Sequence, residues 1–176
     1  KPPLPDLFAR EDGARVQSPA EWSERALAWR DQIVNLEYGG MPPPPDRVEV
    51  EYLCRSVLRR WQGQPANWSL RIHCMGGDRD FTFHATLLFP KAETPLPVII
   101  NGDGCWRYAT DEVVASLLEA GYAFMQFDRT ELAADLPTRN GGLYDVYAGQ
   151  TFAALSAWAW GYHRCRDVIE QMPFLH

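Results

Sequence analysis

Cys105 is the residue whose type and surroundings come nearest to those of a catalytic nucleophile. It lies in the glycine-containing loop at residues 101–106, Asn-Gly-Asp-Gly-Cys-Trp, directly after the apolar run at 98–100. A reactive thiolate needs a nearby histidine or cation, and the sequence shows none close to Cys105. We therefore favour a packed or disulfide-bonded Cys105 over a nucleophilic one.

The loop at residues 101–107 has two interpretations that the sequence leaves open. In the first, Gly102 and Gly104 allow a tight backbone path, and N–H groups of the loop help to hold a negatively charged oxygen during acyl transfer. In the second, the loop is an ordinary glycine turn between a strand and a helix. The candidates for an oxyanion loop or a pocket wall are Gly104, Cys105, Trp106, Arg107 and Arg129.

Arg129 and Glu131 follow the carboxyl end of another apolar segment, residues 122–127. Ligands of open α/β sheets bind at the edge formed by the carboxyl ends of the strands. An ion pair between these two side chains would hold the loop in place. We favour that internal ion pair over contact with a substrate.

No serine or histidine has the setting of a catalytic triad. A triad serine sits on an exposed strand-to-helix turn beside free amides, and none of the six serines does so. His73 and His84 fall on predicted strands, out of phase with the apolar face, so we expect both in solvent. We assign no histidine the role of general base.

The cysteines show no metal-site spacing. They are Cys54, Cys74, Cys105 and Cys165. None forms a Cys-X-X-Cys pair or lies near a histidine at zinc-finger spacing, so we expect no metal site. An exported protein with four cysteines has three possible disulfide pairings, and buried free thiols are the alternative. The sequence leaves this choice open.

The elements that must position these residues begin with a helix after residue 18. Residues 18–21, Ser-Pro-Ala-Glu, combine a serine cap with a proline in the first turn. Apolar residues then recur at steps of four and three, so the helix has one apolar face. These residues are Trp22, Ala26, Trp29, Ile33 and Leu36. Both tryptophans fall at core spacing, and Gly39-Gly40 end the helix.

The pattern along the rest of the chain is that of strands followed by β/α units. Residues 48–54, 70–74 and 81–89 alternate apolar and polar with a period of two, with a turn at 76–78, which predicts an antiparallel meander. The apolar strands at 98–100 and 122–127 alternate with helices at 110–121 and 151–172. We expect parallel pairing and right-handed crossovers for these units.

Composition excludes two classes of partner. The chain has 176 residues, 46% of them hydrophobic, and a formal net charge of −6 without any block of lysine or arginine. We therefore expect no nucleic-acid partner. No apolar run approaches the roughly 20 residues that span a bilayer, so we expect no membrane partner either.

A meander that leads into β/α units is the opening of the α/β-hydrolase sheet, a three-layer αβα sandwich. We predict an N-terminal arm and capping helix at residues 1–46, and the N-terminal half of one such domain at 47–176. In this interpretation the C-terminal half of the domain is missing. The β/α unit that carries the nucleophile would begin beyond His176.

One helix carries a family resemblance. Residues 155–161, Leu-Ser-Ala-Trp-Ala-Trp-Gly, followed by Arg164 and Asp167, resemble the helix that precedes the nucleophile strand of the glucuronoyl esterases. Weaker similarities to that family lie at residues 4–6, 18–22, 38–42 and 127–135.

The resemblance implies an esterase that cleaves esters between 4-O-methyl-glucuronic acid on xylan and lignin alcohols. It implies a Ser–His–carboxylate triad, an arginine beside the nucleophile that helps to hold the oxyanion, and no metal or organic cofactor. The triad would lie in the missing half, so we expect residues 1–176 alone to be inactive. The partners are then a polysaccharide ester and that missing half, and an extracellular polymer implies a secreted or periplasmic protein.

Two alternative functions remain open. One is a deacetylase similar to acetyl xylan esterases, which differ in the side of the ester that carries the sugar. The other is a non-catalytic carbohydrate-binding or scaffold fragment, which the 12% aromatic content and the missing triad favour. The alanine- and tryptophan-rich face of the helix at 151–172 argues against the second, because such a face needs a sheet to cover it.

Overall fold

The computed structural model describes residues 4, 6–10, 12–76 and 79–176. Parts of the predicted N-terminal arm, of the motif at 4–6 and of the turn at 76–78 therefore lie outside the described residues. The elements are, in chain order, α1 (Pro19–Tyr38), β1 (Arg47–Val57), β2 (Ala66–Met75), β3 (Phe81–Phe89), β4 (Val98–Asn101), α2 (Asp111–Glu119), β5 (Ala123–Phe127), the 3-10 turn η1 (Arg129–Glu131), α3 (Leu143–Val146) and α4 (Ala154–Glu170).

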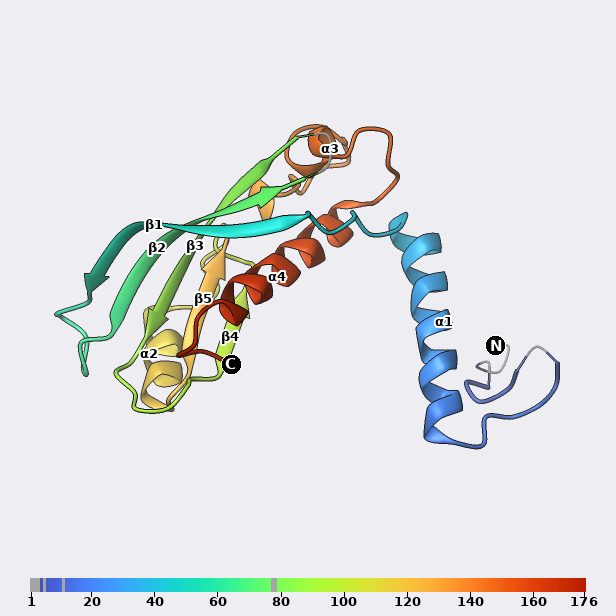
Figure 1. Cartoon of the computed structure of the whole chain (residues 1–176), viewed down its shortest axis with the longest axis horizontal. Helices are drawn as coiled ribbons and strands as arrows, with labels where there is room; N and C mark the ends of the chain where they lie inside the picture. The colour runs from blue at the N-terminus through green and yellow to red at the C-terminus, as the bar shows by residue number, and fades with distance from the viewer. Residues whose placement is uncertain (1–3, 5, 11, 77–78) are drawn as a thin grey trace.

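The strands form one mixed sheet in the order β1-β2-β3-β5-β4 (Figure 1). Strand β2 pairs antiparallel with β1 on one side and with β3 on the other, and β3 also pairs antiparallel with β5. Strands β4 and β5 pair parallel, with Val98 opposite Ala123. The predicted antiparallel meander followed by parallel β/α units is confirmed.

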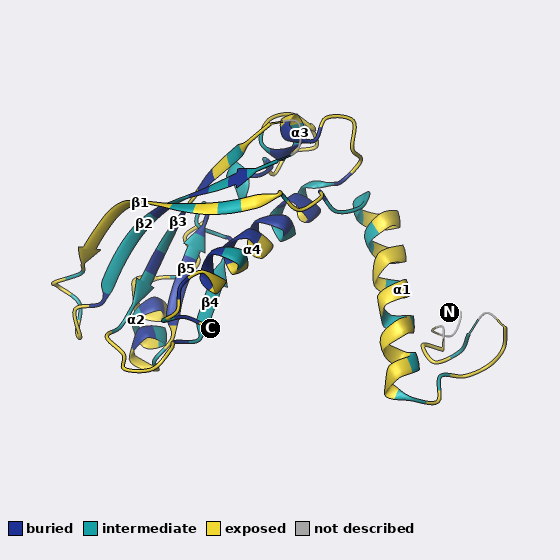
Figure 2. Cartoon of the chain, in the orientation of Figure 1, coloured by how far each residue is buried: buried dark blue, intermediate teal, exposed yellow. Residues whose placement is uncertain are grey.

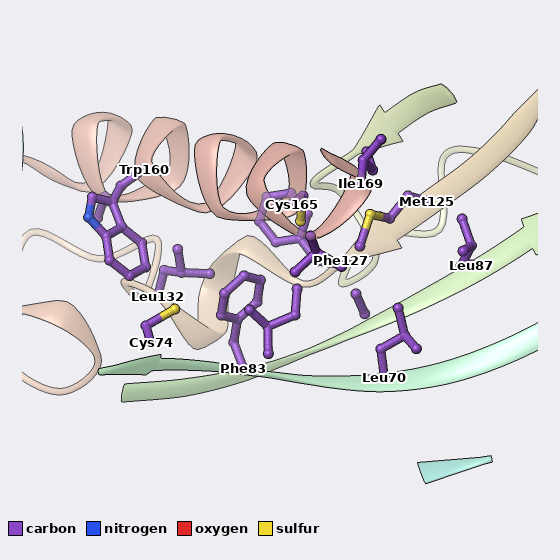
Figure 3. Packing of buried hydrophobic residues seen from close by; sticks show 14 of the residues in the cluster. Leu70, Cys74, Phe83, Leu87, Met125, Phe127, Leu132, Trp160, Cys165 and Ile169 are labelled. Carbon is purple, nitrogen blue, oxygen red and sulfur yellow. The ribbon is translucent and has the colours of Figure 1, made fainter. Parts of the chain in front are cut away.

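One face of the sheet carries the main core, and α4 covers it (Figure 3). Alternate residues of β2 and β3 point to this face, and Leu70, Ile72, Phe83 and Leu87 are fully buried there. From α4, Trp160 packs edge-on against Phe81 at the start of β3. Burying each large apolar side chain stabilises the fold by about 1.5–3 kcal/mol. The prediction that a sheet covers this helix is confirmed.

The opposite face carries α2 over the parallel strands. Val114 and Leu118 of α2 form a second buried cluster with Phe124 of β5. Because β5 alternates, Phe124 faces α2 while Met125 belongs to the core under α4. The sheet is thus sandwiched between helices at β4 and β5, which gives the three-layer arrangement of an α/β-hydrolase.

Helix α1 begins and ends as predicted. The Ser18 hydroxyl accepts a hydrogen bond from the Glu21 amide at 3.2 Å, and Pro19 occupies the first turn. The Glu21 carboxylate accepts from the Gln17 amide at 2.9 Å, one residue before the cap. At the other end Gly39 adopts φ +69°, and a Cβ there would meet the Thr151 carbonyl oxygen at 2.0 Å.

The core spacing predicted for Trp22 and Trp29 is wrong, because α1 buries none of its residues. The helix stands away from the sheet, and most of its surface is exposed (Figure 2). It meets the body at its carboxyl end, where the Tyr38 carbonyl accepts from the Ala153 amide at 2.7 Å. Trp22 packs instead on Phe8, with ring centroids 5.2 Å apart.

Candidate active-site edge

The loops after β4 and β5 lie side by side at the carboxyl edge of the parallel strands. The Gly104 amide donates to the Phe127 carbonyl at 3.0 Å, and the Arg129 amide donates to the Gly102 carbonyl at 3.0 Å. A Cβ on Gly104 would meet that same Phe127 oxygen at 2.8 Å. A glycine is therefore required for the two loops to approach this closely.

Most backbone amides of the loop at 102–107 already donate hydrogen bonds within the protein. The Gly102 amide donates to the Tyr162 hydroxyl at 2.8 Å, and the Asp103 amide to the Asn101 side chain at 3.1 Å. The amides of Trp106 and Arg107 both donate to the Asp103 carbonyl. Among the described residues, the Cys105 amide is the one in this loop without a backbone or side-chain acceptor on another residue. An oxyanion role for the loop therefore depends on that amide.

The Cys105 side chain is a protonated thiol rather than an activated thiolate. Burial raises the pKa of the thiol above its usual value, and the neighbouring Asp128 carboxylate raises it further by charge repulsion and a hydrogen bond. Arg129 opposes this effect more weakly. All four cysteines are free in the structure, but the alternative of buried free thiols describes only Cys74 and Cys165, because Cys105 is half-buried and Cys54 is exposed.

Arg129 joins three segments of the edge. Its Nη1 lies 2.5 Å from Asp103 Oδ1, and its Nη2 lies 3.9 Å from Asp135 Oδ2. The guanidinium carbon sits 4.2 Å from the ring centroid of Trp158 on α4. The contact with Asp103 is close but poorly aligned, because Asp103 Oδ1 accepts no hydrogen bond from the described residues. Its strength is therefore mainly electrostatic.

The predicted ion pair between Arg129 and Glu131 is wrong. Glu131 instead accepts from His84, whose Nδ1 lies 2.9 Å from Glu131 Oε2. The reason is the 3-10 turn of η1: with three residues per turn, side chains two positions apart point in different directions. His84 is exposed, as predicted, although its pairing with Glu131 has no local signal in the sequence.

Trp106 and Arg107 lie on the outside of this edge. Trp106 is exposed and stacks on Tyr108, with centroids 6.3 Å apart and an interplanar angle of 11°. Arg107 has φ +52°, a left-handed backbone that ends the turn. The two side chains therefore remain candidates for a pocket wall that faces solvent.

A groove that the sequence interpretation missed opens beside Arg129. Its volume is about 490 Å³, and its lining includes Asp135, Arg139, Tyr144 and Trp158. Arg139 is held by the carbonyls of Gln150 and Thr151, each at 2.7 Å. The Trp158 indole N–H donates to the Ala133 carbonyl at 2.8 Å. Trp158 was recognised only as part of a helix motif, because a helix pattern does not show which loop crosses it.

The described residues hold no group of three or more histidine, cysteine, aspartate or glutamate side chains with the geometry for a metal ion. Among the same residues, no helix has both the length and the apolar character needed to cross a bilayer.

Comparison with known proteins gives one consistent family. A family model described as glucuronyl esterase of fungi matches residues 72–176. The chain is 28% identical to the 4-O-methyl-glucuronoyl methylesterase 1 of Phanerochaete chrysosporium over 97% of its own length and 34% of that protein. The chain thus spans about a third of the length of this curated relative.

Solved structures give the same result for the fold. A carbohydrate esterase family 15 glucuronoyl esterase from Caldicellulosiruptor kristjansonii superposes with a TM-score of 0.75 at 26% identity, over 99% of this chain and 47% of that one. A glucuronoyl esterase from Sporotrichum thermophile superposes with a TM-score of 0.73 at 23% identity, over 98% of this chain and 43% of that one. That second structure is a serine-to-alanine mutant in complex with methyl 4-O-methyl-β-D-glucopyranuronate.

Proposed function

Since its matched residues 72–176 make up more than half of the sequence, the chain belongs to the glucuronoyl esterase family, and we propose that it contributes to a serine-type carboxylic ester hydrolase. The substrate we propose is a glucuronoyl ester that links xylan to lignin. Family membership and the α/β-hydrolase fold support this proposal. Because the chain spans about a third of a curated relative, the proposal concerns the whole protein.

The observation that carries the proposal is the pairing beside β4. Leu175 forms a parallel bridge with Leu96, just before β4 begins. The Leu96 amide donates to the Phe174 carbonyl, and the His176 amide donates to the Leu96 carbonyl, both at 2.9 Å. A strand that continues from this bridge would run parallel to β4 and end beside the loop at 101–107.

That position is where the α/β-hydrolase fold carries its nucleophile turn. We therefore propose that the segment of the relatives that this chain does not match supplies the strand, the serine and the triad partners. The serine oxygen attacks the ester carbonyl while the histidine takes its proton, which then leaves with the alcohol. Water hydrolyses the acyl-enzyme that remains, and the glucuronic acid is released.

The described residues contribute support at this edge. Arg129 and Asp103 hold the loop at 101–107 in place, and the Cys105 amide is free to add one hydrogen bond to the oxyanion. Trp106, Arg107 and the groove beside Trp158 wall the site. A polymer substrate lies outside the cell, so we propose that the protein is secreted or periplasmic.

The test compares two lengths of protein on three substrates. Residues 1–176 and the longer protein that contains them are assayed with methyl 4-O-methyl-glucuronate, benzyl glucuronate and acetylated xylan. We expect the longer protein to hydrolyse both glucuronate esters and residues 1–176 to hydrolyse neither. Hydrolysis of acetylated xylan alone would identify a deacetylase instead. Turnover by residues 1–176 would show that the nucleophile lies within the chain, against the proposal.

A further inference from the structure

A cavity of about 490 Å³ lies between the β1–β2 turn and α2, away from the edge that carries Arg129. Its inner surface is apolar: Pro65 and Leu118 are buried, and Trp61 is half-buried. Charged side chains of Arg60 and α2 stand around the opening. The volume falls within the roughly 300–1,000 Å³ typical of small-ligand sites, and an apolar lining with a few polar groups is their usual chemistry.

The tryptophan of this cavity is fixed before any ligand arrives. The turn that carries it is closed by hydrogen bonds from the Leu58 amide to the Pro65 carbonyl at 2.9 Å and from the Gln64 amide to the Trp61 carbonyl at 3.1 Å. Trp61 packs against the cluster that contains Leu118 and Phe124. Stacking of a ligand on the indole therefore costs little side-chain conformational entropy, because Trp61 is already ordered.

The charged groups at the opening are available to a ligand. The neighbouring Thr110 side chain lowers the pKa of the Glu112 carboxyl below its usual value. Arg60, Asp111 and Glu119 form no ion pair with the residues that the structure describes. The opening thus holds more carboxylates than cations, and two of the carboxylates are free to accept hydrogen bonds.

We propose that this cavity binds a neutral sugar chain, at a second site apart from the ester-cleaving edge. The C–H face of a sugar ring can stack on the Trp61 indole, while its hydroxyls donate to Asp111 and Glu119. A uronate is disfavoured, since its carboxylate would approach like charges. The choice of a sugar rests on the proposed function, because an enzyme that acts on xylan works on a chain of neutral sugars. The site would hold unsubstituted parts of that chain.

The test measures binding of xylohexaose to the longer protein that contains residues 1–176, by calorimetry and by tryptophan fluorescence. Trp61→Ala should weaken binding about tenfold or more. Ala115→Gln places a longer side chain at the cavity without removing Trp61, and it should weaken xylohexaose binding to a similar extent. This second variant keeps the test valid if Trp61→Ala fails to fold. Trp22→Ala and Glu37→Gln, both on α1, are the matched controls and should bind as the unaltered protein does.

The outcomes separate this site from the proposed function. Loss of xylohexaose binding in the cavity variants, with ester hydrolysis retained on small substrates, supports the site. Unchanged binding in both cavity variants overturns it, whatever the hydrolysis assay shows. Glucuronic acid binding that Trp61→Ala weakens as strongly as it weakens xylohexaose binding, or binding of aromatic alcohols in place of xylohexaose, also overturns the assignment to a neutral sugar. Xylohexaose binding without any ester hydrolysis would leave the site standing and refute the proposed function.

Discussion

Helices α1 and α4 have similar sequence patterns and opposite surroundings. Both carry tryptophans and alanines at helical spacing, yet α4 buries Trp160, Cys165 and Val168 on the sheet while α1 buries none of its residues. The α1 side chains Leu27, Ile33 and Leu36 remain exposed. The difference teaches that periodicity identifies an apolar face, but that a face is buried only where the fold supplies another surface.

The largest expected effect tests whether α4 is essential to the core. Trp160→Ala removes a side chain that is 1% exposed and whose indole N–H donates to the Pro43 carbonyl at 2.8 Å. We expect it to lower the free energy of unfolding by about 3–5 kcal/mol. Trp22→Ala on α1 is the matched control and should cost less than about 1 kcal/mol. Urea unfolding measures both, and equal losses would contradict the contrast between the helices.

The next effect concerns how closely α4 approaches the sheet. A Cβ on Gly161 would lie 2.6 Å from Leu132 Cδ2 and 2.8 Å from a Phe127 ring carbon. We expect Gly161→Ala to destabilise the protein by about 1–3 kcal/mol through overpacking, although alanine favours a helix by about 1 kcal/mol. Ala28→Leu on exposed α1 adds volume where nothing crowds it. Thermal unfolding should show a lower melting temperature for Gly161→Ala alone.

A smaller effect is expected where Arg129 covers Trp158 of α4. Arg129→Gln removes the ion pair with Asp103 and the contact with the indole. We expect a loss of about 1–2 kcal/mol in unfolding free energy. On α1, Arg30→Gln breaks an exposed pair with Asp31 and should change stability by less than about 0.5 kcal/mol. If the longer protein hydrolyses glucuronate esters, Arg129→Gln should also lower kcat, whereas Arg30→Gln should not.

The last effect, which needs alkaline pH, is a loss of stability from the thiols buried in the core under α4. Burial raises the pKa of Cys74 from 9.0 to about 12, and it raises the pKa of Cys165 as well. A raised pKa means that the folded state holds its proton longer than the unfolded chain, so stability is complete below pH 9 and falls as the pH rises towards 12.

We expect each buried thiol to reduce the free energy of unfolding by about 1 kcal/mol between pH 9 and pH 10. Denaturant unfolding at pH 8, 9 and 10 measures the slope, and Cys74→Ala should make it shallower. Cys54→Ala, at an exposed position of β1, is the control and should leave the slope unchanged. A slope that Cys74→Ala does not alter would contradict this assignment.

Much of the fold follows from local patterns. The alternation in β2 and β3, the apolar run of β4 and the cap at Ser18 each predicted an element that the structure contains. These signals succeed because the pleat of a strand and the turn of a helix impose periods that sequence can show. The candidate site was less accessible. Gly104 and Arg129 were recognised, but their partners were not, because Phe127, Asp103 and Trp158 meet them only through tertiary contacts.

By itself, the sequence determined the five strands and the helices α1, α2 and α4, but not η1 or α3. It also determined the change from antiparallel to parallel pairing and, through the helix at 155–161, the family. Tertiary structure alone decided that Arg129 pairs with Asp103 rather than Glu131. It also decided that most amides of the loop at 102–107 already donate hydrogen bonds within the protein, and that α1 stands away from the core. The physical reason is the separation along the chain over which each kind of interaction acts. Caps, turns and periodicity act over a few residues, whereas an ion pair or a buried face depends on surfaces that distant segments bring together.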